Sequence, residues 1–399
     1  MPPNASDPEL HAWLRLSLEP ALGAARIRLL LSVFGMPQEI VAATTGNLAR
    51  YLDPALAARL RQPPEPDVQT HIDQALDWLR ADDHHLLTLA DPLYPRSLLE
   101  LNDPPPVLYA HGCLDVLRKP MLAIVGARHA TADGERNARA FARHLAQQGW
   151  CIISGLASGI DGAAHEGALD AGATGGGTVA VLGTGIDRVY PPAHHALAHR
   201  IVGHGLLLSE FPLQTPGLPR HFPQRNRIVA ALSQGVLVVE AATRSGSLIT
   251  ARLAGEMGRE VFAIPGSIHS PLSRGCHALI RQGAKLVESG QDILEELRQG
   301  TLPGLPPKGA ARTAPDAHEG TGPPGPVGGA DSLTDASSDP LSDPDDVALM
   351  QRIGLDAVAL DTLQAELDWP AERLMSRLTL LEIAGRIERT DDGRFRRRT

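Results

Sequence analysis

Apolar residues recur at helical spacing near the start of the chain, as Ile27, Leu30, Leu31 and Phe34 illustrate. The segments that follow this pattern are ELHAWLRLSL, PALGAARIRLLLSVFG, MPQEIVAAT, LARYLDPALAARL and VQTHIDQALDWLRAD. Together they predict a small helical module over residues 1–80. Its PALG turn resembles a helix–hairpin–helix, a module that grips the DNA backbone. No basic residues flank the turn, however, so a short packing bundle is the better interpretation.

The pattern changes after residue 86, where short apolar runs alternate with glycine turns and helices. The strand-like runs are LAIVGA, WCIISG, TVAVLG, LLLSEF, VLVVEA and EVFAIPG. Because whole runs are apolar, each strand should be covered on both faces, as in a mostly parallel sheet. We predict an α/β fold over residues 81–300, an extended Rossmann-like doubly wound parallel sheet.

Residues 301–345 have no apolar periodicity and are rich in Pro, Gly, Ser, Ala and Asp. Such a segment buries too little apolar surface to offset its ordering entropy, so a disordered linker is predicted. Apolar periodicity returns over 346–399, with three helical segments followed by the basic hairpin RTDDGR. This order is typical of a winged-helix domain.

Charge is distributed unevenly along the chain. The net charge is −9, but residues 121–290 carry 15 Lys and Arg against 11 Asp and Glu, while the remainder carries 22 against 35. The predicted sheet domain is therefore the cationic part, which is compatible with an anionic partner such as nucleic acid.

The three cysteines, Cys113, Cys151 and Cys276, are far apart and have no metal-ligand or redox spacing. The N-terminus shows no signal-peptide pattern, and no apolar run approaches the roughly 18 residues that cross a membrane. We expect a reduced, cytoplasmic protein without a membrane span.

Two glycine-rich loops follow the first predicted strands. Ligands of open α/β sheets bind at the carboxyl ends of the strands. Gly126 and Arg128 follow the first strand, but G-x-G-x-x-G is absent, so we predict an anion site and no dinucleotide cofactor. The next loop offers its amides at a helix start, where Asp161 is predicted to be the N-cap, a structural role. The loop residues are Gly155, Ser158 and Gly159.

Histidines follow the third strand. Gly183 and Gly185 form half of a dinucleotide motif, and His195 and His199 have the i, i+4 spacing of zinc ligands. No H-E-x-x-H pattern or nearby cysteine supports a metal, so a surface pair is the better interpretation. His165, on the preceding helix, is predicted to be packed or hydrogen-bonded rather than catalytic.

The segment HFPQRNRIVAALS, at 221–233, mixes cations with an aromatic ring. Aromatic faces stack bases and guanidiniums bind phosphates, so this mixture suits a flexible nucleic-acid strand. Ser245, Gly246 and Ser247 open a further helix and offer another anion site, while Glu240 either orients an arginine or acts as acid or base. The candidate binding residues of the basic segment are Arg220, Phe222, Arg225, Asn226 and Arg227.

The series of motifs resembles one bacterial family. AIVGAR, SGLASGIDGAAHEGAL, AVLGTGID, SEFP, FPQRNRIVAALS, RSGSLITA and REVFAIPG occur in order. Over about 85–300 the chain is similar to the DprA/Smf family of DNA-processing proteins. Departures are small: Ala127 stands where the family often has serine, and His194 where it often has asparagine.

The resemblance implies a protein that binds and protects single-stranded DNA and loads the RecA recombinase during natural transformation. It also implies a homodimer, an N-terminal module resembling a sterile-alpha-motif fold, and no cofactor or established catalysis. The family's pocket corresponds here to Arg128, Arg220, Phe222, Arg225, Asn226 and the glycine-rich turns.

Two other functions stay open. A phosphoribohydrolase of the related Rossmann superfamily would need a PGGxGTxxE loop, but the chain has EAATRSGSLITA. A transcription regulator would read duplex DNA through the winged helix, whose third helix presents only Arg373 and Arg377.

Overall fold

The computed structural model describes residues 7–299 and, toward the C-terminus, residues 349, 353, 362–363, 374, 378, 381, 387–389 and 395–397. The chain divides into two compact units, Met1–Thr313 and Ala314–Thr399. The predicted linker over 301–345 lies outside the described residues.

Nine strands between residues 7 and 299 form one sheet in the order β1-β2-β6-β5-β4-β3-β7-β8-β9. The strands are β1 (His84–Thr88), β2 (Val107–Gly112), β3 (Met121–Val125), β4 (Cys151–Ser154), β5 (Thr178–Val181), β6 (Leu206–Ser209), β7 (Gly235–Val238), β8 (Glu260–Ala263) and β9 (Lys285–Leu286). β2 pairs antiparallel with β1 and with β6, and the remaining pairs are parallel. The predicted mostly parallel α/β sheet is confirmed.

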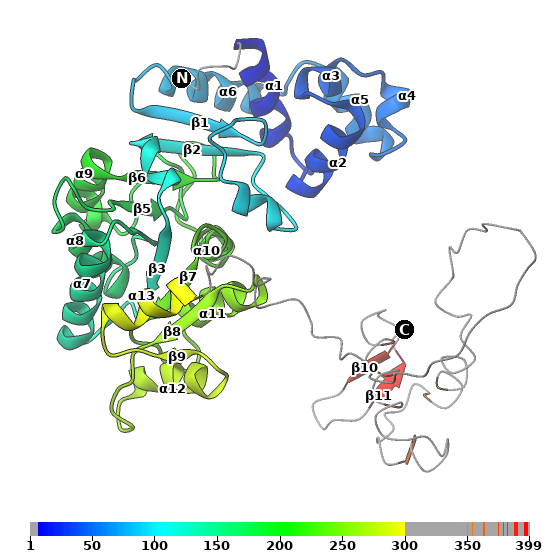
Figure 1. Ribbon diagram of the computed structural model, residues 1–399. Helices are drawn as coiled ribbons and strands as arrows, with labels where there is room; N and C mark the ends of the chain where they lie inside the picture. The colour runs from blue at the N-terminus through cyan, green and yellow to red at the C-terminus, as the bar shows by residue number, and fades with distance from the viewer. Residues whose placement is uncertain are drawn as a thin grey trace, which may run out of the picture. The chain divides into compact units, whose positions relative to one another are not determined.

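Helices cover both faces of this sheet, which explains why its strands are apolar throughout (Figure 1). Leu122 and Ile124 of β3 face α7 and α8, whereas Ala123 and Val125 belong to the core beneath α10 and α11. The covering helices are α7 (Ala132–Gln147), α8 (Ile160–Leu169), α9 (His195–His204), α10 (His221–Leu232), α11 (Ser247–Glu256), α12 (Arg274–Arg281) and α13 (Gly290–Gln299).

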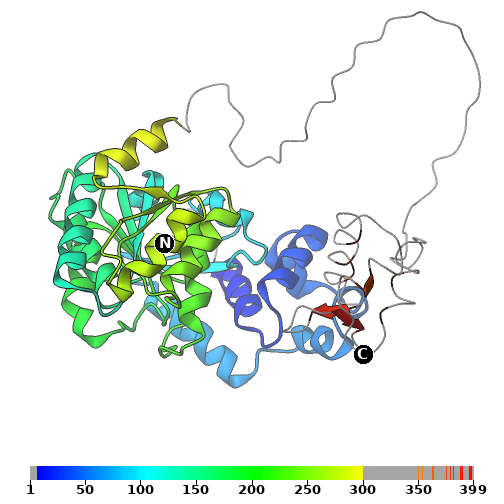
Figure 2. The same ribbon diagram turned by 90° about the horizontal axis from the view of Figure 1, so that it is seen from below.

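The N-terminal helices lie at the β1 end of the sheet and α12 at its β9 end (Figure 1), and the view from below shows the N-terminal helices to one side of the sheet domain (Figure 2). They are α1 (Asp7–Leu18), α2 (Ala24–Phe34), α3 (Pro37–Ala42), α4 (Thr45–Leu48), α5 (Pro54–Arg61) and α6 (Pro66–Trp78). α1 to α5 enclose a small core of their own, whereas Trp13 of α1 and Ile72 of α6 share a second core with Tyr109 of β2. The helical module is thus fused to the sheet through α1 and α6.

In the C-terminal unit, β10 (Ile387–Arg389) and β11 (Phe395–Arg397) form an antiparallel hairpin. Phe395 is buried with Leu349, Ile353, Leu363 and other leucines. The hairpin predicted at RTDDGR is present, and the chain around Arg373 and Arg377 lies outside the described residues. Among the described residues, no helix combines the length and apolar character needed to cross a membrane.

The strand order reverses at β3. β4, β5 and β6 follow on one side of it, and β7, β8 and β9 lie on the other. Loops leaving β3 and β7 diverge from this point, so a crevice opens between them at the carboxyl ends of the strands. Doubly wound sheets bind their ligands in this crevice.

Candidate functional site

A cavity of about 280 Å³ occupies the crevice between β3 and β7. Four segments that are remote in the sequence line it, at the ends of β3, β4 and β7 and on α10. The lining residues are Val125, Gly126, Arg128, Ala157, Asp161, Phe222, Pro223, Arg225, Asn226, Ser245, Gly246, Ser247 and Thr250. Most of the predicted binding residues therefore meet in one place.

Arg128 and Phe222 form the basic and aromatic part of this cavity. Arg128 is exposed, and its guanidinium carbon lies 5.3 Å from the centre of the Phe222 ring. The ring also rests against Gly183, where a Cβ atom would come within 2.9 Å of it. Gly183 therefore serves packing against Phe222 and not a dinucleotide.

Sequence reasoning missed Tyr190, whose ring centre lies 5.4 Å from that of Phe222. Tyr190 is 50% exposed, so it extends the aromatic surface beside the cavity. The sequence contains a pattern that could have identified it. Tyr190 is an aromatic residue in the polar loop that follows β5, at the same edge of the sheet as the other candidate loops.

Arg225 is a buried residue and not a surface cation. It is 3% exposed, and one guanidinium nitrogen donates to the carbonyl oxygens of Gly155 and Val181. Burial lowers the pKa of Arg225 to about 10, and Asp161 opposes this shift, so the guanidinium is charged at neutral pH. Arg225 thus connects α10 to the ends of β4 and β5.

Residues 221–232 of the basic segment form the helix α10, with Pro223 in its first turn, where proline is tolerated. Residues two apart on a helix point about 200° away from each other. Arg227 accordingly points away from Arg225, pairs with Glu210 and Asp103, and does not line the cavity. The structure thus places Arg227 outside the cavity, in contrast to Arg225.

Asp161 organises the loop that precedes α8. Its carboxylate accepts hydrogen bonds from the main-chain nitrogens of Gly155, at 3.1 Å, and Ala157, at 3.3 Å. Gly159 and not Asp161 is the N-cap of α8. The predicted N-cap is therefore wrong, and the Gly155 amide, predicted to be free for an anion, is occupied.

Two glycines in this loop are required by close approaches. A Cβ on Gly155 would lie 2.5 Å from the guanidinium carbon of Arg225. Gly159 has φ +75°, a conformation that side chains disfavour, and a Cβ there would overlap the carbonyl oxygens of Ala127 and Arg128. These glycines hold the β3 and β4 loops together, which fixes the backbone that carries Arg128.

The remaining wall is the start of α11. The Ser245 and Ser247 hydroxyls are 2.7 Å apart, and the side chain of Asn226 donates to the Gly246 carbonyl at 3.4 Å. No acidic residue occupies the first turn of α11. The positive end of the helix dipole therefore faces the cavity without a neutralising carboxylate in that turn.

Glu240 lies behind the cavity and positions the β3 loop. Its carboxylate accepts from the Thr131 main-chain nitrogen at 2.9 Å and the Thr131 hydroxyl at 2.6 Å. Thr131 caps α7, so Glu240 ties the end of β7 to the start of that helix. These contacts leave Glu240 no role in orienting an arginine.

Five predicted binding residues do not line the cavity: Gly155 and Arg227, described above, and Arg220, Ser158 and Gly159. Arg220 is exposed at the start of α10, and Ser158 and Gly159 lie in the loop before α8. His194 bonds the Leu156 carbonyl through Nδ1 at 3.0 Å and supports the same loop.

His165 is buried on α8, and its Nδ1 lies 2.7 Å from the Thr178 hydroxyl. The Thr178 hydroxyl donates to the Ile152 carbonyl at 2.6 Å, so it accepts from the Nδ1–H of His165. Nε2 of His165 is buried without a partner among the described residues. A second proton would have no acceptor, which agrees with the predicted packed histidine.

We expect His165 to make the protein acid-sensitive. Burial lowers the pKa of His165 to about 3, whereas in the unfolded chain it is about 6.5. The unfolded state therefore binds the extra proton first, and the free energy of unfolding should fall by about 2 kcal/mol from this residue between about pH 7 and pH 5. In urea titrations, His165→Gln should lose this part of the pH dependence. Equal dependence in both proteins would contradict the assignment.

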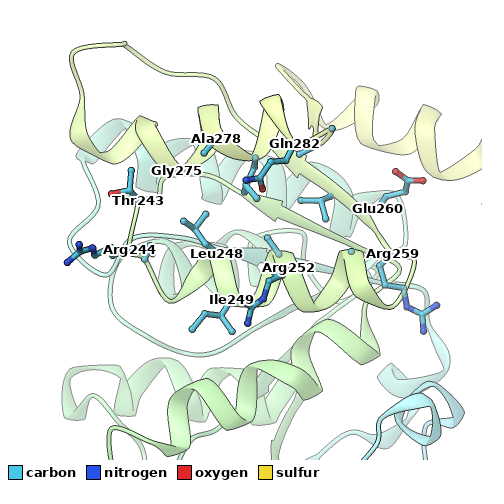
Figure 3. A pocket seen from close by; sticks show the side chains of 17 residues that line it. Thr243, Arg244, Leu248, Ile249, Arg252, Arg259, Glu260, Gly275, Ala278 and Gln282 are labelled. Atoms are coloured by element: carbon cyan, nitrogen blue, oxygen red, sulfur yellow. The ribbon is translucent and has the colours of Figure 1, made fainter. Parts of the chain in front are cut away.

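A second hollow adjoins the first and shares Ser245 with it. This groove has a volume of about 670 Å³ and lies between α11 and α12. Figure 3 shows Leu248 between the two helices, with Arg244 at one end of the groove and Arg259 at the other. Arg259 pairs with Glu100 and Arg252 with Glu256, and Arg244 makes no ion pair within residues 7–299.

Comparison with known proteins identifies the family. The sequence model described as DNA recombination-mediator protein A matches residues 85–298, and that of the DprA winged helix domain matches 334–393. The chain belongs to the DprA/Smf family. The second match also confirms the winged-helix prediction for the C-terminal unit.

The relatives extend over most of the chain. Protein Smf of Escherichia coli (strain K12) is 40% identical over 333 residues, which cover 82% of this chain and 81% of that protein. The DNA processing protein DprA of Streptococcus pneumoniae (strain ATCC BAA-255 / R6) is 46% identical over 228 residues, 55% of this chain and 79% of that protein.

A solved structure agrees with the fold. The X-ray structure of DprA from Streptococcus pneumoniae matches with a TM-score of 0.62 and 40% identity, covering 71% of this chain and 95% of the other. The Rossmann-like architecture of the sheet domain is therefore that of a DprA protein.

Proposed function

We propose that the cavity between β3 and β7 binds single-stranded DNA. The observation that carries this proposal is the exposed guanidinium of Arg128 beside the Phe222 ring, at the mouth of a cavity on the strand-order reversal. A phosphate would bind Arg128 and the start of α11, and a base would stack on Phe222 or Tyr190. Membership of a family of DNA-processing proteins supports the same conclusion.

The polymeric nature of the ligand is supported by the surroundings of the cavity. Arg220, the N-cap of α10, and Arg244, directly before Ser245, are exposed and lie close in the sequence to residues that line the cavity. A single nucleotide would engage the cavity alone, whereas a strand would also reach these outer cations. Stacking on aromatic rings is sequence-tolerant, so we expect little base preference.

Hydrolysis of nucleoside monophosphates is less well supported. Among the residues that line the cavity within 7–299, Asp161 is the one carboxylate, and it accepts two main-chain hydrogen bonds. Glu240 is held by Thr131. Neither carboxylate is placed to act as an acid or base, and free base released from nucleoside monophosphates would overturn this ranking.

Replacing Arg128 by alanine should weaken binding of a fluorescent oligo-dT about 10- to 100-fold, because one charge-assisted phosphate contact is lost. The slope of log affinity against log salt should also become shallower by roughly 0.7. Fluorescence anisotropy at several salt concentrations measures both quantities.

The matched control for this experiment is Arg136→Ala. Arg136 is exposed on α7, pairs with Asp133 and does not line the cavity, so its loss should leave affinity and salt slope unchanged. Equal affinities for the wild type and the Arg128 variant would remove this cavity from the DNA-binding surface.

We also propose, from the family resemblance, that the protein acts as a homodimer and passes bound strands to RecA during transformation or other recombination. Nuclease protection tests strand binding, and strand exchange with the cognate RecA tests the transfer. The two assays are separate, so a failure of strand exchange would not contradict the proposal that the cavity binds single-stranded DNA.

A further inference from the structure

Two histidines and an aspartate meet at the β1–β2 hairpin, at the end of the sheet away from β9 (Figure 1). His84 and His111 are directly opposite each other in the antiparallel register, and their ring centres are 4.4 Å apart. Asp83 precedes β1, and one ligand atom from each of the three residues lies within 4.8 Å of the others. This cluster is built from other loops than the DNA cavity.

The hydrogen bonds at this cluster orient the histidine nitrogens. Nδ1 of His84 donates to the Trp78 carbonyl oxygen at 2.7 Å, because a carbonyl can only accept. In the neutral ring Nε2 therefore carries the lone pair, and it lies 3.9 Å from a carboxylate oxygen of Asp83. A backbone carbonyl on the second nitrogen is the usual outer contact of a histidine that ligates a metal.

The His84 ring is fixed further by Trp78. The two rings are stacked at 4.0 Å with planes 13° apart. Nε2 of His111 lies 3.0 Å from the other carboxylate oxygen of Asp83. Both imidazoles thus direct Nε2 toward one carboxylate, with their positions set by β-sheet pairing and by Trp78.

We propose that Asp83, His84 and His111 bind a divalent transition-metal ion, with Zn²⁺ the best match. Two imidazoles and a carboxylate are a common zinc ligand set, with water in the fourth position. Ligand atoms on a tetrahedral zinc with bonds of about 2.0–2.1 Å are roughly 3.3 Å apart. The separations of 3.0 and 3.9 Å run to the two oxygens of Asp83, and one ligand atom from each residue lies within 4.8 Å of the others, so the three side chains must draw closer to bind one ion.

Binding of the metal ion would stabilise the contact between α6 and the strands β1 and β2. Trp78 is the last residue of α6, which shares a core with α1 and with β1 and β2. A metal on His84 and His111 clamps the two strands together and holds the His84 ring against the end of α6. The ion would therefore stabilise the junction between the helical module and the sheet.

The test uses the untagged, chelator-stripped full chain, titrated with Zn²⁺ in competition with a chromophoric chelator. We expect one Zn²⁺ per chain with raised thermal stability. Asp83→Asn, His84→Gln and His111→Gln should each weaken binding at least about 10- to 100-fold, the loss typical even of outer-shell contacts. Asp83 is exposed, so Asp83→Asn probes the site without disturbing the core.

The matched control is the variant His195→Gln, because His199 on the same helix lies close to His111 in the fold. His195 and His199 are exposed on α9, have ring centres 4.7 Å apart and form a second pair with chelating spacing. The control should keep wild-type affinity. Absence of stoichiometric Zn²⁺ binding, or loss of binding in the control alone, would overturn the proposal.

Discussion

Replacing Arg225 by methionine should lower the free energy of unfolding by about 3–5 kcal/mol, because buried carbonyl oxygens lose their donor and a buried carboxylate loses its neighbouring cation. Methionine fills much of the volume but cannot donate to the Gly155 and Val181 carbonyls. It also removes the cation that attracts the Asp161 carboxylate, whose pKa burial already raises. Urea denaturation of the wild type and the variant at neutral pH measures the difference.

Asp161→Asn separates the two causes of this loss. In the asparagine background no buried carboxylate is left behind, so Arg225→Met should cost less, with a coupling energy of about 0.5–3 kcal/mol. Strictly additive costs would mean that Arg225 acts through the two carbonyls alone. A wild-type free energy of unfolding in Arg225→Met would contradict the buried position itself.

Gly159→Ala should destabilise the protein by about 2–5 kcal/mol and also abolish strand binding. The added methyl group meets a positive φ and two backbone carbonyls, those of Ala127 and Arg128. Backbone atoms cannot rotate away as a side chain does, so the β3 loop must move and carry Arg128 with it. Denaturation and oligo-dT anisotropy measure the two effects.

The same substitution at Gly203 provides the control. Gly203 lies in α9, has no atom within 4 Å of its added Cβ and is not at positive φ. Alanine is favoured over glycine in a helix by about 0.5–1 kcal/mol, so Gly203→Ala should be neutral or stabilising. If the Gly159 variant behaved like the Gly203 variant, the loops after β3 and β4 could move apart without lowering the free energy of unfolding.

The fold was predictable because each strand from β3 to β8 is an apolar run that ends at a glycine or polar turn. The meeting of Arg128, Phe222 and Ser245 was predictable for a related reason, since the ends of parallel strands share one edge. These inferences need only the direction of the strands and not their side-chain packing.

The separate roles of Arg225 and Arg227 were not predictable in the same way. Residues 221–232 form a helix whose buried face includes Ile228, Val229 and Arg225. Helical periodicity separates the two arginines, and burial is decided by distant carbonyls that local sequence does not reveal. The cross-strand pairing of His84 with His111 likewise depends on a register fixed by tertiary structure.

The walls of the cavity between β3 and β7 come from four stretches that end only at Thr250. During synthesis from the N-terminus, Arg128 and Phe222 emerge before the α11 wall that completes their surroundings. A nascent chain therefore has no finished binding surface until most of the sheet has left the ribosome, and such non-local contacts form slowly. Completion of the cavity is thereby postponed until the domain has acquired its final shape.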